Sequence, residues 1–290
     1  MQIECVSPAG AQLGEGALWD AERGLVWWVD IKSPAIHAHR PATGANYVQQ
    51  LSFRLTALGL AADGRLVGAC DHGFVRLTVA RDLSISSIEV LARVDEPAGN
   101  RFNDGKVDAA GRFWVGTMDD EERAARGSLY RLGRSGEAVM VRTGIMVPNG
   151  PAFLADGTML ITDTACRVIT AVTLDVEGNP RGERLFARFT REQGYPDGMT
   201  VDDADHVWIA FWDGWCLRRL SPAGDIVSEI PLPVQRPTCP TFAGDGLDRL
   251  YVTSATVGLS NESLACQPLA GGLLALAPGI RGRPPVCYAG

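Results

Sequence analysis

Four short segments place an acidic or amide side chain beside a glycine at the approach to a predicted strand. They are LGEGALW (13–19), GNRFNDGKVD (99–108), VPNGPAF (147–153) and GYPDGMTVD (194–202). Carboxylate and carboxamide oxygens suit hard cations and polar ligands. Any one segment could be an ordinary turn, because Asn-Gly and Asp-Gly are common turn dipeptides. The same arrangement at four similar places in a repeating chain would instead bring these polar groups together in space.

The elements that must position these groups form an internal repeat. Six segments, starting at residues 20, 61, 108, 154, 202 and 244, each combine an acidic or glycine turn with a short β-rich strand. They start about 40 to 48 residues apart, which is the spacing of propeller blades. No long stretch has a helical apolar period. The sequence therefore predicts an all-β, six-bladed β-propeller with four-stranded antiparallel blades around a central channel. Two smaller β-sandwich domains are the alternative.

Composition sets further bounds on the protein. The chain has 290 residues, of which 46% are hydrophobic and 21% are charged, and its net charge is −7. These values are typical of a globular protein, and the acidic balance argues against a nucleic-acid partner. Seven cysteines without a CxxC pattern argue against a zinc-thiolate site or a disulfide framework. With no Pro-, Ser- or Gly-rich linker, we expect one domain over residues 1–290.

Targeting signals are also missing from the sequence. No apolar stretch approaches the roughly 20 residues of a membrane helix. The start, MQIECVSPAG, lacks the basic residues and apolar core of a secretion signal. We therefore expect a cytoplasmic protein without a membrane partner.

The two chain ends and the histidines give two further expectations. A propeller must close its ring, since an open ring leaves an exposed strand edge. From position alone, we expect residues 2–6 to pair with the last blade near residues 286–288. We expect structural roles for the histidines, which are His37, His39, His72 and His206.

Several longer motifs follow one another along the chain: LGEGALWD with LVWWVDI, RFNDGKVDAAGRFWVGTMD, GSLYRL, PNGPAF with DGTMLITDT, YPDGMTVDDADHVWIAFWDG and RPTCPTFAGDGLDRLYVTSA. In order and spacing they resemble the SMP-30/gluconolactonase/regucalcin family of six-bladed sugar lactonases, and most of all its bacterial sugar-acid lactonases. The resemblance spans nearly the whole chain.

The resemblance implies one divalent metal ion at the top of the channel. Carried over by motif, its ligands are Glu15 in LGEG, Asn149 in PNG and Asp197 in YPDG. Two carboxylates and one amide oxygen suit a hard or borderline cation and leave coordination positions open for water and substrate. Ca, Zn, Mn, Mg and Fe(II) all tolerate such ligands, so the sequence leaves the metal's identity open.

The resemblance also implies three substrate-binding residues: Arg101, Asn103 and Glu121. The segment 119–122 is acidic throughout, so the match also permits a neighbour of Glu121 in that role. On the residues alone, Arg101 could pair with Asp104, and Glu121 could belong to a solvated charge run.

The implied activity is metal-dependent hydrolysis of a sugar-acid lactone to the free aldonic acid in carbohydrate catabolism. Asp197 would be the catalytic base as well as a ligand, unless the ion alone activates the water. No G-x-S-x-G nucleophile motif is present. The alternatives are an aryl-ester or organophosphate hydrolase on the same fold, and a non-enzymatic calcium-binding propeller. Glucono-, galactono-, xylono- and arabinono-lactones all stay open as substrates, as does the oligomeric state.

Overall fold

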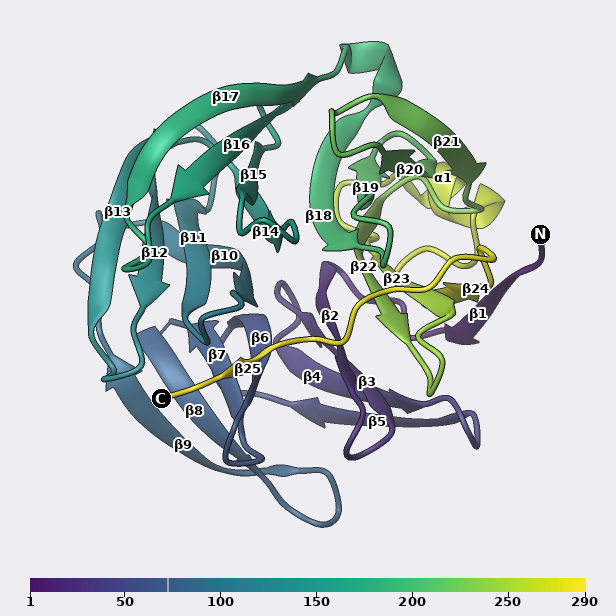
Figure 1. Ribbon diagram of the computed structural model, residues 1–290. Coiled ribbons are helices and arrows are strands. Elements are labelled where there is room, and N and C mark those ends of the chain that lie inside the picture. Colours follow the sequence, from purple (N-terminus) through teal and green to yellow (C-terminus); the bar gives the residue numbers. More distant parts are fainter. Residues whose placement is uncertain (72) are drawn as a thin grey trace.

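The computed structural model describes residues 1–71 and 73–290 and contains six antiparallel sheets arranged around a central channel (Figure 1). The prediction of a six-bladed propeller is thus confirmed, and the alternative of two β-sandwiches is wrong. Besides the strands, the described chain has a short 3-10 helix, η1 (Arg191–Gln193), and one α-helix, α1 (Asn261–Cys266). Among the described residues, no helix has the length and apolarity needed to span a membrane.

In five blades the strands run in chain order from the channel outward, and in the sixth the N-terminal strand is the outer one. From inner to outer strand, the blades are β2 (Gly14–Asp20), β3 (Leu25–Asp30), β4 (Ala35–Arg40) and β5 (Ala45–Gln50); β6 (Leu55–Ala61), β7 (Leu66–Cys70), β8 (Gly73–Val79) and β9 (Ile85–Ala92); β10 (Asn100–Val107), β11 (Phe113–Asp119), β12 (Gly127–Leu132) and β13 (Ala138–Ile145); β14 (Pro148–Phe153), β15 (Met159–Asp163), β16 (Val168–Leu174) and β17 (Pro180–Arg188); β18 (Tyr195–Val201), β19 (Val207–Trp212), β20 (Cys216–Leu220) and β21 (Ile226–Pro231); and β22 (Pro237–Ala243), β23 (Arg249–Ser254), β24 (Leu273–Leu276) and β1 (Ile3–Ser7).

A hydrogen bond between an aspartate and a tryptophan, here called the clamp, recurs in several blades and explains part of the sequence repeat. Asp108 follows the inner strand β10, and its Oδ1 accepts bonds from the backbone N–H groups of Ala110 and Arg112, which closes the turn. Its Oδ2 accepts a bond from the indole of Trp114, which is buried in the second strand. The same clamp recurs in two other blades, as Asp20 with Trp27 at 3.1 Å and Asp202 with Trp208 at 2.9 Å. The buried carboxylate thus ties the turn to the core, and every indole N–H in these pairs has a partner.

The N-terminal strand closes the ring, but not at the expected place. β1 pairs with β24, with Ile3 opposite Leu276. Residues 286–288 do not receive it; instead β25 (Cys287–Tyr288) pairs in parallel with the inner strand β6. Position in the sequence alone could not show that the chain leaves the last blade after β24. Residues 277–289, which we call the C-terminal strap, cross the end of the channel to reach β6 (Figure 1).

A β-bulge interrupts the inner strand at each of the four polar segments. The register shifts lie between Glu15 and Leu18, Phe102 and Gly105, Asn149 and Ala152, and Pro196 and Met199. Gly16 and Gly150 adopt φ values of 63° and 81° there, which glycine adopts without a Cβ clash. A bulge re-aims side chains locally. The four segments are therefore not turns between strands but bulges within the inner strands, beside the channel.

Candidate metal and substrate site

One end of the channel opens into a cavity of about 570 Å³, which we call the upper chamber. The first residues of the inner strands line it, because these strands all run in the same direction through the ring. Five of the six residues that the sequence singled out lie in its wall: Glu15, Arg101, Asn103, Asn149 and Asp197. They come from the inner strands of four blades, so the propeller gathers residues that are far apart in the chain.

Glu15 and Asp197 are buried carboxylates without a cationic partner. Their exposed fractions are 5% and 4%, and no ion pair with Lys or Arg reaches either one among the described residues. Burial raises the pKa of both groups well above the usual range, and repulsion adds to it, from Asp197 and Asp104 on Glu15 and from Asp104 on Asp197. A buried charge needs a compensating charge. The donor set therefore fits a divalent cation, which would supply that compensation.

The orientation of the Asn149 side chain follows from its partners. Its Nδ2 donates to Thr164 Oγ1 at 2.9 Å, and Thr164 Oγ1 donates in turn to the Pro196 carbonyl at 2.7 Å. The Asn149 Oδ1 accepts a bond from Asn103 Nδ2 at 3.0 Å. Since Thr164 has given its only proton to Pro196, it can only accept from Asn149. The amide oxygen of Asn149 consequently faces Asn103 and the upper chamber, as a metal ligand would require.

Arg101 is held by a carboxylate, but not by Asp104. Its Nε donates to Asp120 Oδ1 at 2.6 Å, and its Nη1 donates to Asn103 Oδ1 at 2.7 Å. Asp120 also accepts bonds from Lys32 at 2.8 Å and Arg54 at 2.7 Å. Burial opposes ionisation of Asp120, but these three cations outweigh it and hold the pKa of this carboxyl well below its usual range. Asp120 is therefore an anionic hub that fixes Arg101, in a role the sequence did not indicate.

Glu121 and Glu122 are placed differently by the turn that follows β11. Glu121 is exposed and pairs with Arg123, and it is not among the residues of the chamber wall. Glu122 lines the upper chamber, and its backbone has the positive φ of 55°. The N–H of Glu122 bonds to the Asp119 carbonyl at 2.9 Å, which closes the turn, and Glu122 borders the chamber although it is also exposed. Because Glu121 and Glu122 are adjacent in an acidic segment, nothing in the sequence indicates which of them borders the chamber.

Sequence reasoning missed an aromatic and cationic rim around the chamber. Arg236 donates to Asp213 Oδ1 at 2.8 Å and lies 4.6 Å from the ring centre of Trp212. Arg167 lies 5.3 Å from the ring centre of Tyr195. These residues belong to loops and strand ends rather than to a repeated motif, so only the folded ring shows that they meet. The chamber wall contains none of His37, His39 and His206, while His72 lies outside the described residues.

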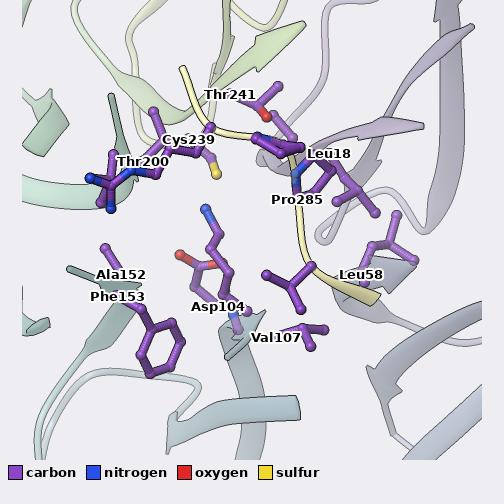
Figure 2. A pocket seen from close by; sticks show the side chains of 18 of the residues that line it. Leu18, Leu58, Asp104, Val107, Ala152, Phe153, Thr200, Cys239, Thr241 and Pro285 are labelled. Carbon is purple, nitrogen blue, oxygen red and sulfur yellow. Dashed lines mark hydrogen bonds between the residues drawn. The ribbon is translucent and has the colours of Figure 1, made fainter. Parts of the chain in front are cut away.

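The opposite end of the channel holds a second cavity of about 240 Å³, the lower chamber (Figure 2). Residues from the far ends of the inner strands line it, and Pro285 of the C-terminal strap borders it. Lys106 reaches across it to donate to the Met199 carbonyl at 2.7 Å. Asp104 lies between the chambers, and its carboxylate accepts bonds from the N–H groups of Gly105 and Gly150. Most of the remaining wall is apolar, so the polar chemistry is concentrated in the upper chamber.

Comparison with known proteins agrees with this architecture. Residues 13–256 match the model of the SMP-30/Gluconolactonase/LRE-like region. The chain is 34% identical to a 6-deoxy-6-sulfogluconolactonase of Pseudomonas putida, over 99% of each chain. It is also 34% identical to a pentonolactonase of Haloferax volcanii, over 98% of this chain and 97% of that protein.

A solved structure described as a calcium-binding protein, regucalcin, from Agrobacterium tumefaciens superimposes with a TM-score of 0.92. The two are 29% identical, and the match covers 98% of this chain and 96% of the other. The family model covers most of the chain, and the relatives cover nearly all of it. The chain accordingly belongs to the SMP-30/gluconolactonase/LRE-like family.

Proposed function

We propose that this protein is a divalent-metal-dependent hydrolase that opens a sugar-acid lactone to the free aldonic acid. One observation carries the proposal: two buried, unpaired carboxylates, Glu15 and Asp197, share a chamber with the polar side chains of Arg101 and Asn103. Relatives named as a sulfogluconolactonase and a pentonolactonase support the substrate class. We further propose a place in carbohydrate catabolism and a cytoplasmic location.

Glu15, Asn149 and Asp197 would hold the metal ion through oxygen atoms. When bound, a divalent ion supplies Lewis-acid polarisation of the lactone carbonyl. The ligand set permits Ca, Zn, Mn, Mg or Fe(II). A structural relative is described as calcium-binding, which supports a divalent ion as the cofactor.

The chain's own residues then bind the sugar and move a proton. Arg101, Asn103 and an acidic residue from the turn after β11 would hold the sugar hydroxyls. For that acidic residue we propose Glu122 rather than Glu121, because Glu122 lines the chamber. A carboxylate oxygen of Asp197 accepts a proton from the attacking water, whose oxygen adds to the carbonyl carbon. The ring C–O bond breaks, and Asp197 returns the proton to the leaving ring oxygen.

Two other functions deserve comparison with this proposal. An aryl-ester or organophosphate hydrolase would need an apolar pocket for its substrate, whereas Arg101, Asn103 and Glu122 present charged and amide groups to the upper chamber. A non-enzymatic calcium-binding propeller would need the metal ligands. It would have no need of a buried Arg101 that Asp120 holds in the chamber wall. The chamber's polar wall therefore favours the lactonase.

The test is a pH-indicator assay on protein that has been chelated and reloaded with one metal at a time. Substrates are glucono-, galactono-, xylono- and arabinono-lactone, with phenyl acetate and paraoxon for the alternative. We expect metal-dependent opening of at least one sugar lactone. Asp197→Ala should lose at least about 100-fold in kcat, the scale of general-base catalysis. Asp203→Ala, a change at an exposed position in the same blade, should retain activity. Lactone turnover that survives chelation, or turnover of the aryl ester alone, would overturn the proposal.

A further inference from the structure

Arg167 is a cation of the upper chamber that forms no ion pair with a carboxylate of the described residues. It lines the cavity, and its guanidinium stacks over Tyr195. Its Nε is buried without a hydrogen-bond partner, and its Nη1 makes only a long contact of 3.5 Å with the Ala165 carbonyl. No ion pair within 4.0 Å joins it to a carboxylate of the described residues, and Glu192 interacts with its charge only over a longer distance. Unsatisfied buried donors of this kind are rare in folded proteins and call for an explanation.

The other cations of the chamber wall already form ion pairs with carboxylates. Lys32 and Arg101 both bind Asp120, and Arg236 binds Asp213. These three side chains therefore have carboxylate partners before any ligand arrives. Arg167 differs from them in that its charge remains available.

Arg167 is also placed at a defined position relative to the metal ligands. It lies on the same turn as Thr164, whose hydroxyl holds the amide of Asn149. Tyr195, on which it stacks, lies two residues before Asp197 in β18. The backbone of Arg167 has a positive φ of 55°, a conformation that non-glycine residues rarely adopt. The fold thus holds this guanidinium beside the candidate metal site, while the residues for sugar hydroxyls come from the blade of β10–β13.

We propose that Arg167 binds an anionic substituent of the substrate, and that this chain prefers a sugar lactone with a carboxylate, sulfonate or phosphate distant from the reacting carbonyl. This proposal rests on the proposed lactonase function. A guanidinium offers several N–H groups in a fork that matches the oxygens of such anions. Stacking on Tyr195 orients the fork in advance, which lowers the entropy lost on binding. The anion would supply the acceptors that Arg167 lacks.

The test compares glucono-1,5-lactone with 6-phosphoglucono-1,5-lactone, which differ only at the end distant from the carbonyl. We expect kcat/KM to favour the phosphorylated lactone. Arg167→Gln should lower kcat/KM for that lactone by about 10- to 100-fold, mostly through KM, and leave the neutral lactone within about twofold. Arg167→Lys should keep part of the preference, since it keeps the charge but loses the fork. Arg188→Gln makes the same charge change at an exposed site on β17 of the same blade, and it should preserve the preference.

Equal kcat/KM for the two lactones, or an equal loss on both in Arg167→Gln, would overturn the anion site while leaving the lactonase intact. If neither lactone is opened, the proposed lactonase function is wrong. The anion site at Arg167 can then still be tested by calorimetric binding of D-glucarate and D-gluconate. Tighter binding of the dianion glucarate that Arg167→Gln abolishes would uphold the anion site. Equal binding of the two acids, or a preference that Arg167→Gln leaves unchanged, would refute it.

Discussion

The side chains of Asn149 and Thr164 lie 2.9 Å apart, and the direction of the hydrogen bond between them is fixed because Thr164 donates onward to the Pro196 carbonyl. Asn149 must therefore point its nitrogen at Thr164 and its oxygen at the chamber. Thr164 is not a candidate metal ligand itself. It nevertheless determines whether the Asn149 amide oxygen can bind the metal ion.

Replacing Thr164 by valine should weaken metal binding without disturbing the fold. The substitution keeps the shape of the side chain but removes the acceptor for Asn149, so the amide can rotate. Loss of such an outer partner typically costs about 10- to 100-fold in metal affinity. Isothermal titration of chelated protein with Ca²⁺ or Mn²⁺ measures the effect. Thr173→Val, at an exposed position in β16 of the same blade, is the control and should bind like the parent. Equal affinities for all three proteins would show that Thr164 does not orient a ligand.

Neutralising one of the two carboxylates should affect stability in opposite directions with and without metal. In the chelated protein, Glu15→Gln or Asp197→Asn removes repulsion between buried groups whose pKa values are raised by burial and by neighbouring carboxylates. We therefore expect each variant to unfold at a higher temperature than the chelated parent. With saturating metal the order should reverse, because tight binding to the folded parent adds stability that the variants lose. Thermal unfolding with chelator and with excess metal measures both. If the variants were less stable than the parent in chelator, repulsion among these buried carboxylates could not be what destabilises the metal-free protein.

Tyr288 should account for much of the strap's contribution to stability. Its side chain is 1% exposed, and its hydroxyl donates to the Gly133 carbonyl at 2.8 Å, so it joins the strap to the neighbouring blade. We expect Tyr288→Ala to lower the free energy of unfolding by about 3 to 5 kcal/mol, as for other buried aromatic truncations. Tyr288→Phe keeps the ring and should cost only about 1 kcal/mol. Urea unfolding separates these values. A strap that merely lies on the surface would make both losses negligible.

His37 should make the protein less stable in mild acid. Its ring stacks on Trp28 with centroids 3.8 Å apart, and burial lowers the pKa of His37 to about 4. An unfolded histidine titrates near pH 6.5, so between about pH 6.5 and 4 the unfolded state binds more protons than the folded state. Stability should consequently fall as the pH drops through this window. His37→Phe keeps a stacked ring but cannot titrate, and it should show a shallower fall in urea midpoint from pH 7 to 4.5. Parallel curves for the two proteins would contradict this assignment.

Repetition made the ring predictable, whereas the details of the chamber depended on local geometry. The six turn-and-strand segments recur at blade spacing, and Glu15, Asn149 and Asp197 stand at equivalent bulges, so a repeat implies their convergence. Arg167 has no counterpart in a repeated motif, and nothing in the chain indicates that it meets Tyr195 from the next blade. Which of the two glutamates borders the chamber depends on the backbone of their turn, where Glu122 has a positive φ of 55°. The path of the strap depends on contacts with several blades rather than on any local pattern.

The pairing of β1 with β24 has a consequence for the synthesis of the protein. All strands of the first five blades have left the ribosome once Pro231 has emerged, so these blades can form in order during translation. The last blade cannot, because its outer strand β1 precedes the other five blades in the chain, whereas its other three strands follow them. Until Leu276 emerges, that strand has an unpaired edge, which is the kind of edge that invites wrong partners. Closure of the ring therefore waits until the first of its strands to be synthesised can meet one of the last.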